Sequence, residues 1–76
     1  MKKIEFIDLL EKVKEYSQTE KKMIEKAYQY AKDLHQGQYR QSGEPYVMHP
    51  LTVAYILADM HADCDTICAG LLHDTL

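Results

Sequence analysis

A histidine followed directly by an aspartate, His73-Asp74, is the most suggestive chemical feature of the sequence. Neighbours on a helix point about 100° apart, so the two side chains do not face each other, yet both can reach an ion lying between them. An imidazole and a carboxylate together suit Mn, Fe, Zn or Ni better than Ca or Mg. His49 is a third candidate ligand, because it stands where a loop meets a predicted helix and Pro50 fixes the backbone after it. The structural alternative is that His73 and Asp74 are simply a pair on a helix surface. His49 would then be a helix N-cap or a loop histidine held by hydrogen bonds.

A competing set of metal ligands has the spacing His61-x2-Cys64-x3-Cys68-x4-His73, which resembles a zinc site. Cys68 and His73 are five residues apart, about 140° around a helix, so they do not converge on one ion. We expect Cys68 to pack as a small apolar residue and Cys64 to be a thiol in a linker. His35 closes a predicted helix, where we expect it to satisfy terminal carbonyl groups.

Charge is divided sharply along the chain. All nine Lys and Arg residues lie at or before Arg40, and residues 41–76 hold five acids, three of the four histidines and no Lys or Arg. Acids and histidines without cations suit a metal ion better than the bare phosphates of a polyanion. The lysines of the first half alternate with acids and the net charge is −3, so we predict no nucleic-acid partner. Arg40, with Tyr39 and Tyr46 nearby, can stack on a base or bind phosphate bidentately; otherwise it is a solvated loop residue.

The length of 76 residues allows one small domain or part of one. No apolar run approaches the roughly 20 residues of a membrane helix, and Glu5 and Asp8 interrupt any signal-peptide core. We therefore predict a cytoplasmic protein without a membrane partner. The sequence stops within a helical pattern, and we expect the chain to be a fragment.

Apolar residues recur at three- and four-residue steps through most of the chain, which predicts an all-α fold with about four helices. The second helix is expected over 18–35, begun by a Ser17–Glu20 capping box and ended by Gly37 in a left-handed conformation. Its buried side is predicted to hold six residues: Met23, Ile24, Ala27, Tyr28, Ala31 and Leu34. The first helix is expected to bury Ile4, Phe6, Ile7, Leu10 and Val13.

Residues 38–49 form the one long stretch without periodicity, and we predict a structured loop there. Pro50 fits the first turn of a third helix, where its missing N–H costs nothing. Asp65 is the expected N-cap of a fourth helix that runs to the end of the chain.

These pieces join into one pattern that closely resembles the start of the hydrolase domain of RelA/SpoT-type alarmone enzymes, members of the HD-domain superfamily. The resemblance covers residues from about 24 to 76 and rests on three strings: Ala31-x3-His35-x-Gly37-Gln38-x-Arg40-x-Ser42-Gly43-Glu44-Pro45-Tyr46-x2-His49-Pro50, then Ala54-x2-Leu57-Ala58-Asp59, then Ala69-Gly70-Leu71-Leu72-His73-Asp74.

The resemblance implies removal of the 3′-pyrophosphate of guanosine tetra- or pentaphosphate, with a Mn²⁺ ion as cofactor. The family's metal ligands map onto His49, His73 and Asp74, and its guanine-stacking arginine maps onto Arg40. Two further residues, Ser42 and Gly43, fall in the loop that lines the nucleotide pocket.

Two departures from the family pattern accompany this resemblance. Gln41 stands where the family usually carries Lys, so one cationic contact to substrate is lost or supplied elsewhere. The family's Glu-Asp pair, proposed to position water, would follow just after Leu76, so no catalytic residue is expected within the chain. Residues 1–76 are thus expected to be a partial HD hydrolase domain, inactive by itself, from a parent that is a bifunctional synthetase/hydrolase of the stringent response. The alternative is a non-catalytic helical module that forms a homo-oligomer or binds a partner through an exposed apolar face.

Overall fold

The computed structural model describes residues 4–39, 41, 43 and 45–73. Four helices follow in order, α1 (Phe6–Lys12), α2 (Gln18–Leu34), α3 (Met48–Asp59) and α4 (Cys64–Leu72), and the described residues contain no strand. The predicted all-α fold is therefore confirmed. None of these helices is long and apolar enough to cross a membrane.

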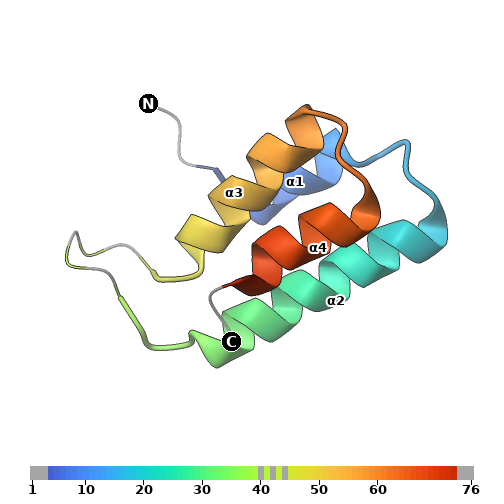
Figure 1. The fold of residues 1–76 in the computed structure, drawn as a ribbon. Helices are drawn as coiled ribbons and strands as arrows, with labels where there is room; N and C mark the ends of the chain where they lie inside the picture. The colour runs from blue at the N-terminus through green and yellow to red at the C-terminus, as the bar shows by residue number, and fades with distance from the viewer. Residues whose placement is uncertain (1–3, 40, 42, 44, 74–76) are drawn as a thin grey trace.

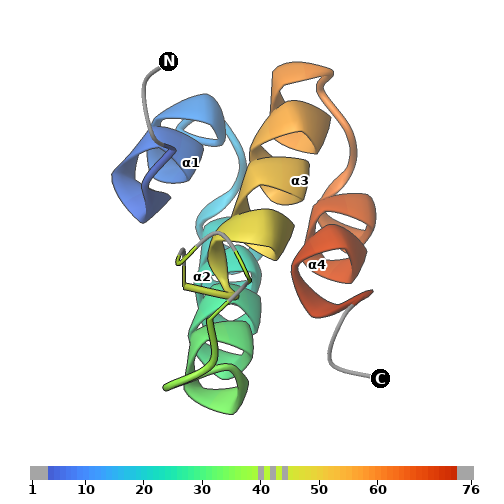
Figure 2. The same ribbon diagram turned by 90° about the vertical axis from the view of Figure 1, so that its left-hand side faces the viewer.

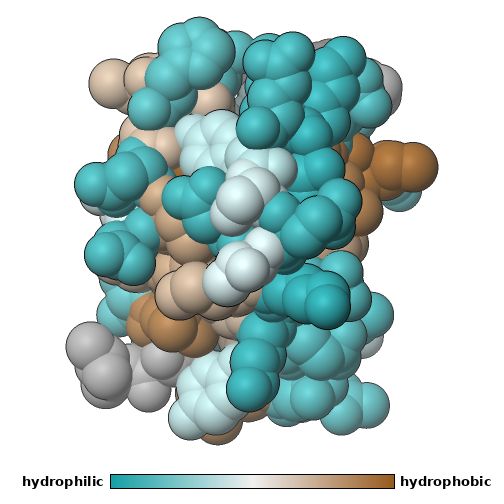
Figure 3. All heavy atoms as spheres, turned by 90° about the vertical axis from the view of Figure 1, so that its right-hand side faces the viewer, coloured by the Kyte–Doolittle hydropathy of each residue, from teal (hydrophilic) through white to brown (hydrophobic). Residues whose placement is uncertain are grey.

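The helices pack in a fixed order across the molecule. α4 lies against both α2 and α3, and α1 packs on α3 (Figure 1). Seen along a second direction, α3 lies between α1 and α4 (Figure 2). The links α1–α2 and α3–α4 share one end of the molecule, which presents a mainly hydrophilic surface (Figure 3). The start of α3 and the end of α4 therefore lie at the opposite end.

Local sequence signals place the limits of α2 as expected. The Ser17 Oγ accepts from the Glu20 N–H at 3.1 Å, and the Glu20 Oε1 accepts from the Ser17 N–H at 3.0 Å. This reciprocal pair is the predicted capping box, and it satisfies two N–H groups that the helix cannot. Gly37 has φ +79°, the predicted left-handed conformation, and Pro50 lies in the first turn of α3.

The start of α4 differs from the prediction. Asp63 caps the helix, its Oδ1 accepting from the Thr66 N–H at 2.8 Å, so the expected N-cap at Asp65 is wrong. The reason is the tight link from α3: His61 takes a φ of 60°, and the Ala62 N–H returns to the Leu57 carbonyl at 3.0 Å. Because the chain turns so early, Cys64 is the buried first residue of α4 and is not in a linker.

The hydrophobic core is built from all four helices. Its ten buried members are Leu9, Val13, Ile24, Ala27, Leu51, Ala54, Ala58, Cys64, Ile67 and Leu71. On α1 it is Leu9 that is fully buried, whereas Ile7, expected inside, is 67% exposed. Met23 and Leu34 on α2, also expected inside, are each 46% exposed. One edge of the predicted apolar stripe of α2 is thus open, because Met23 and Leu34 lie only about 20° apart around the helix.

Gly70 allows α4 to lie close against α3. A Cβ at this position would lie 2.8 Å from the Leu57 Cδ1 and 3.3 Å from the Val53 Cγ1. Real Cβ atoms do not approach a neighbour to 2.8 Å, so any larger residue must move the Leu57 side chain or separate the helices.

We predict that Gly70→Val lowers the free energy of unfolding by about 1–3 kcal/mol, the usual cost of overpacking. Urea denaturation measures the change. Ala69→Val is the matched control, because Ala69 is exposed on the same turn and tests only the β-branched side chain in a helix. Equal losses in both variants would contradict the close-approach argument.

A second prediction concerns acid stability. Thr66, through hydrogen bonds from its side chain and its backbone N–H, lowers the pKa of the Asp63 carboxyl below its usual range. A depressed folded-state pKa gives stability that is present above about pH 4 and is lost as the pH falls through the folded value. Asp63→Asn keeps a capping oxygen but cannot titrate, so its melting temperature should vary less with pH below about pH 4. A parallel acid decline in wild type and variant would refute the assignment.

Candidate functional site

The structure brings two of the three predicted metal ligands together. His49 lies at the start of α3 and His73 caps the end of α4, and these two ends meet because the helices run in opposite directions (Figure 1). The ring centroids are 5.5 Å apart with an angle of 64° between the ring planes. Both side chains are exposed at the surface. The third predicted ligand, Asp74, lies outside the described residues.

The backbone of α4 fixes how the His73 ring presents itself. The His73 Nδ1 lies 2.6 Å from the Gly70 carbonyl oxygen. A carbonyl only accepts, so Nδ1 is assigned as the protonated nitrogen and Nε2 as the one that carries a lone pair. Metal-binding histidines typically hold the second ring nitrogen in this way, which sets both the tautomer and the ring orientation.

The spacing of the two imidazoles can be compared with that of two histidines on one divalent ion. With metal–nitrogen bonds of about 2.1 Å, two rings on adjacent coordination positions have centres about 5 Å apart, close to the spacing found here. Within the described part of the chain, no group of three His, Cys, Asp or Glu side chains could hold a metal. The described residues therefore bring two candidate nitrogen ligands together where α3 begins and α4 ends.

The loop predicted to contact nucleotide joins α2 to α3 and ends just before His49 in the chain. Arg40 and Ser42, two of its predicted substrate-binding residues, lie outside the described residues. Gly43, the third, is exposed, has φ +89°, and has nothing within 4 Å of the position of a Cβ. A side chain is disfavoured there by the backbone conformation and not by crowding. A cavity of about 370 Å³ at the base of the loop is lined by residues that include His35, Gln38, Tyr39 and Pro45.

The role of His35 was missed from the sequence. We expected it to satisfy carbonyl groups at the end of α2, but its Nδ1 lies 3.0 Å from the Gln38 Oε1 and its ring stacks on Tyr46. The spacing His35-x2-Gln38 contained the signal, because residues three apart just past a helix end can return to each other. Tyr46 is eleven residues from His35 in the sequence, so its contact with the ring had no local signal.

The cysteines do not form the competing zinc site in the described part of the chain. The Cys64 Sγ donates to the Glu20 carbonyl at 3.7 Å and lies 4.0 Å from the Cys68 Sγ, and both thiols are free. Two sulfurs fall short of the four ligands of structural zinc, and no third His, Cys, Asp or Glu among the described residues completes the set. His61 is exposed at the far end of α3.

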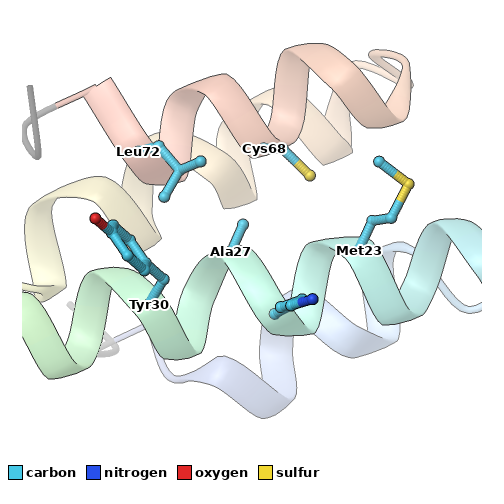
Figure 4. A pocket seen from close by; sticks show the side chains of 6 residues that line it. Met23, Ala27, Tyr30, Cys68 and Leu72 are labelled. Carbon is cyan, nitrogen blue, oxygen red and sulfur yellow. The ribbon is translucent and has the colours of Figure 1, made fainter.

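Cys68 instead lines an apolar groove between α2 and α4. The groove has a volume of about 490 Å³, and its lining residues are Met23, Lys26, Ala27, Tyr30, Cys68 and Leu72 (Figure 4). Two of these are largely exposed side chains of α2, Met23 at 46% and Tyr30 at 58%. Self-association was predicted through an exposed apolar face whose place on the molecule was not specified, and oligomer formation stays a prediction.

Comparison with known proteins gives the family. A family model described as an HD domain matches residues 27–76, so the chain belongs to the HD-domain family. The bifunctional (p)ppGpp synthase/hydrolase SpoT of Escherichia coli is 53% identical over 55 residues, which is 72% of this chain and 8% of that protein. The GTP pyrophosphokinase rsh of Brucella melitensis is 49% identical over 70 residues, 91% of this chain and 9% of that protein. A guanosine-3′,5′-bis(diphosphate) 3′-pyrophosphohydrolase of Aquifex aeolicus is 48% identical over 67 residues, 88% of this chain and 10% of that protein.

The resemblance to RelA/SpoT-type enzymes is thereby confirmed, and the alternative of a non-catalytic module is not favoured. The chain spans a tenth or less of the length of these relatives. The matched region contains the histidine pair, the loop and all of α3 and α4.

We predict that Cys68 is a poor nucleophile at neutral pH. Burial, and then the neighbouring Cys64, raise the pKa of the Cys68 thiol to about 11 from the usual 9.0, so the thiol stays protonated. Iodoacetamide should modify Cys68 more slowly in the folded chain than in urea, as followed by mass spectrometry. A raised folded-state pKa gives stability that is full below about pH 9 and is lost as the pH rises toward 11, and Cys68→Ser should flatten that loss. Fast labelling of folded Cys68 at pH 7 would contradict the assignment.

Proposed function

We propose that this chain supplies the first metal ligands and the guanosine-contacting loop of a Mn²⁺-dependent guanosine-3′,5′-bis(diphosphate) 3′-pyrophosphohydrolase. The observation that carries the proposal is the convergence of His49 and His73, with the His73 tautomer set by the Gly70 carbonyl. The relatives support the substrate class, since proteins named as hydrolases of this nucleotide share about half of their aligned residues with this chain.

The metal would be held by His49, His73 and Asp74. When bound, Mn²⁺ polarises a phosphoryl oxygen and lowers the pKa of a coordinated water. The chain's own contribution is positional: α3 and α4 fix the two imidazoles, and the hydrogen bond to Gly70 presents the Nε2 lone pair of His73.

The nucleotide would be held by the loop that follows α2. Arg40 supplies a planar guanidinium suited to stacking on guanine, and Ser42 supplies a hydroxyl for a phosphate oxygen. Gly43 has no side chain, so a ligand can come close to its backbone. The space beside it is open, since no atom lies within 4 Å of the position of a Cβ. Gln41 cannot provide the charge of the family's lysine, so the loop carries one cation where the family carries two.

The proposal also covers the parent protein and the compartment in which it acts. The parent is a bifunctional synthetase/hydrolase, like the Escherichia coli relative. It acts in the cytoplasm, where the two free thiols of α4 would stay reduced.

Manganese binding tests the metal half of the proposal. The chain should bind Mn²⁺, followed by the loss of the free-ion signal in electron paramagnetic resonance. Replacement of either ligand, His49→Ala or His73→Ala, should weaken binding by more than about tenfold. His61→Asn is the matched control, because His61 is exposed at the other end of α3 and Asn tolerates its φ of 60°. Equal losses in all three variants would sink the assignment of the pair.

Binding of guanosine tetraphosphate, measured by titration calorimetry with Mn²⁺ present, tests the nucleotide half. Arg40→Ala should weaken binding of guanosine tetraphosphate by about tenfold or more, the loss of one charge-assisted contact, while leaving Mn²⁺ affinity unchanged. Gln41→Lys should strengthen binding, because it restores a second cation to the loop. A Gln41→Lys variant with unchanged affinity, together with an unaffected Arg40→Ala variant, would place the nucleotide elsewhere.

A further inference from the structure

The loop between α2 and α3 is closed at its base by backbone hydrogen bonds. The Gln38 N–H donates to the His35 carbonyl at 2.9 Å, and the Tyr46 N–H donates to the Gln38 carbonyl at 3.0 Å. One antiparallel bridge then joins Tyr39 to Pro45. The chain thus leaves and returns through a narrow neck formed by Gln38, Tyr39, Pro45 and Tyr46. In the sequence, Arg40 and Ser42 stand between the two sides of that neck.

A single side chain touches both sides of the neck. The His35 Nδ1 is 3.0 Å from the Gln38 Oε1 on the outgoing side. Its ring stacks on Tyr46 on the returning side, with centroids 4.8 Å apart and 27° between the planes. His35 is only 8% exposed and stands at the C-cap of α2, so it ties the neck to the body of the helix.

The other ring nitrogen of His35 shows that stability alone does not explain a histidine here. Its Nε2 is buried and has no hydrogen-bond partner among the described residues. A buried polar atom without a partner loses its hydration and gains nothing in return. An apolar ring would keep the stacking on Tyr46 without that loss, so what the imidazole adds is the Nδ1–H that reaches Gln38.

We infer that His35 is a positioning residue, which holds the neck of the 38–46 loop in register for the loop's contacts with guanosine phosphates. This inference rests on the proposed function for its ligand but not for its geometry. It predicts that the positioning of the loop and the stability of the fold respond in opposite directions when the imidazole is replaced by an apolar ring.

The test compares His35→Phe with wild type in four measurements. The melting temperature should stay the same or rise, because the unpartnered Nε2 is gone. Amide exchange at Tyr46 and Gln38 should speed up while exchange within α4 does not change. Guanosine tetraphosphate should bind about five- to tenfold more weakly, as expected for the net loss of one hydrogen bond that orders the loop, while Mn²⁺ affinity stays within about twofold.

Gln38→Ala removes the same hydrogen bond from the exposed side of the neck and does not change the packing around His35. It should reproduce the faster exchange and weaker nucleotide binding even if a phenyl ring does not fit at position 35. His61→Asn again controls for loss of a histidine elsewhere.

The outcomes distinguish a failure of the role inferred for His35 from a failure of the proposed function. Lower stability with faster exchange throughout the molecule in His35→Phe, and no effect of Gln38→Ala, would show a purely structural residue and overturn the inference. Unchanged exchange at Tyr46 in both variants would overturn it as well. If the wild-type chain fails to bind guanosine tetraphosphate, the proposed function fails, and the exchange measurements still decide whether His35 holds the neck.

Discussion

The close approach of α4 to α3 is the constraint on which the rest of the structure depends. Gly70 permits it, because a Cβ there would lie 2.8 Å from the Leu57 side chain. The carbonyl oxygen of the same residue accepts a hydrogen bond from the His73 Nδ1. One glycine therefore sets both the distance between the two helices and the tautomer of the imidazole at the end of one of them. A larger residue would change the core and the geometry of the histidine pair together, so the two cannot be tuned independently.

The free energy of burying each kind of side chain explains why the core is apolar and the candidate ligands lie at helix ends. Among the described residues, the buried side chains are apolar apart from His35 at the base of the loop. His49 and His73 remain exposed, where an imidazole keeps its hydration until a ligand replaces it. The ends of helices are a favourable place for such residues, because a helix end can be positioned by the core without lying in it. His35, the buried polar residue in the part of the chain that the structure describes, is the one that ties the loop to α2.

Local chemistry could be predicted from the sequence, and tertiary choices could not. The Ser17–Glu20 box, the turn at Gly37 and the proline in the first turn of α3 all depend on neighbours within four residues. Asp63 and Asp65 are both acceptable caps by type, and only the tight link after α3 decides between them. Likewise, periodicity marks an apolar stripe but not its edges. Which of its residues are buried depends on where the neighbouring helices lie, so Leu9 is inside while Ile7 and Met23 are not.

The candidate site divides along the same line. Residue types made His49 and His73 plausible ligands, and the family resemblance joined them, but neither could show that antiparallel packing brings the rings to 5.5 Å. His35 is the opposite case, since its pattern was part of the resemblance but its contact with Tyr46 crosses a loop. A residue that positions others has no chemistry of its own to detect in a sequence. It becomes visible through an imbalance in the fold, here a buried nitrogen without a partner beside one that bonds to the neck of the loop. That imbalance is the expected physical mark of a position where geometry for a ligand takes precedence over stability.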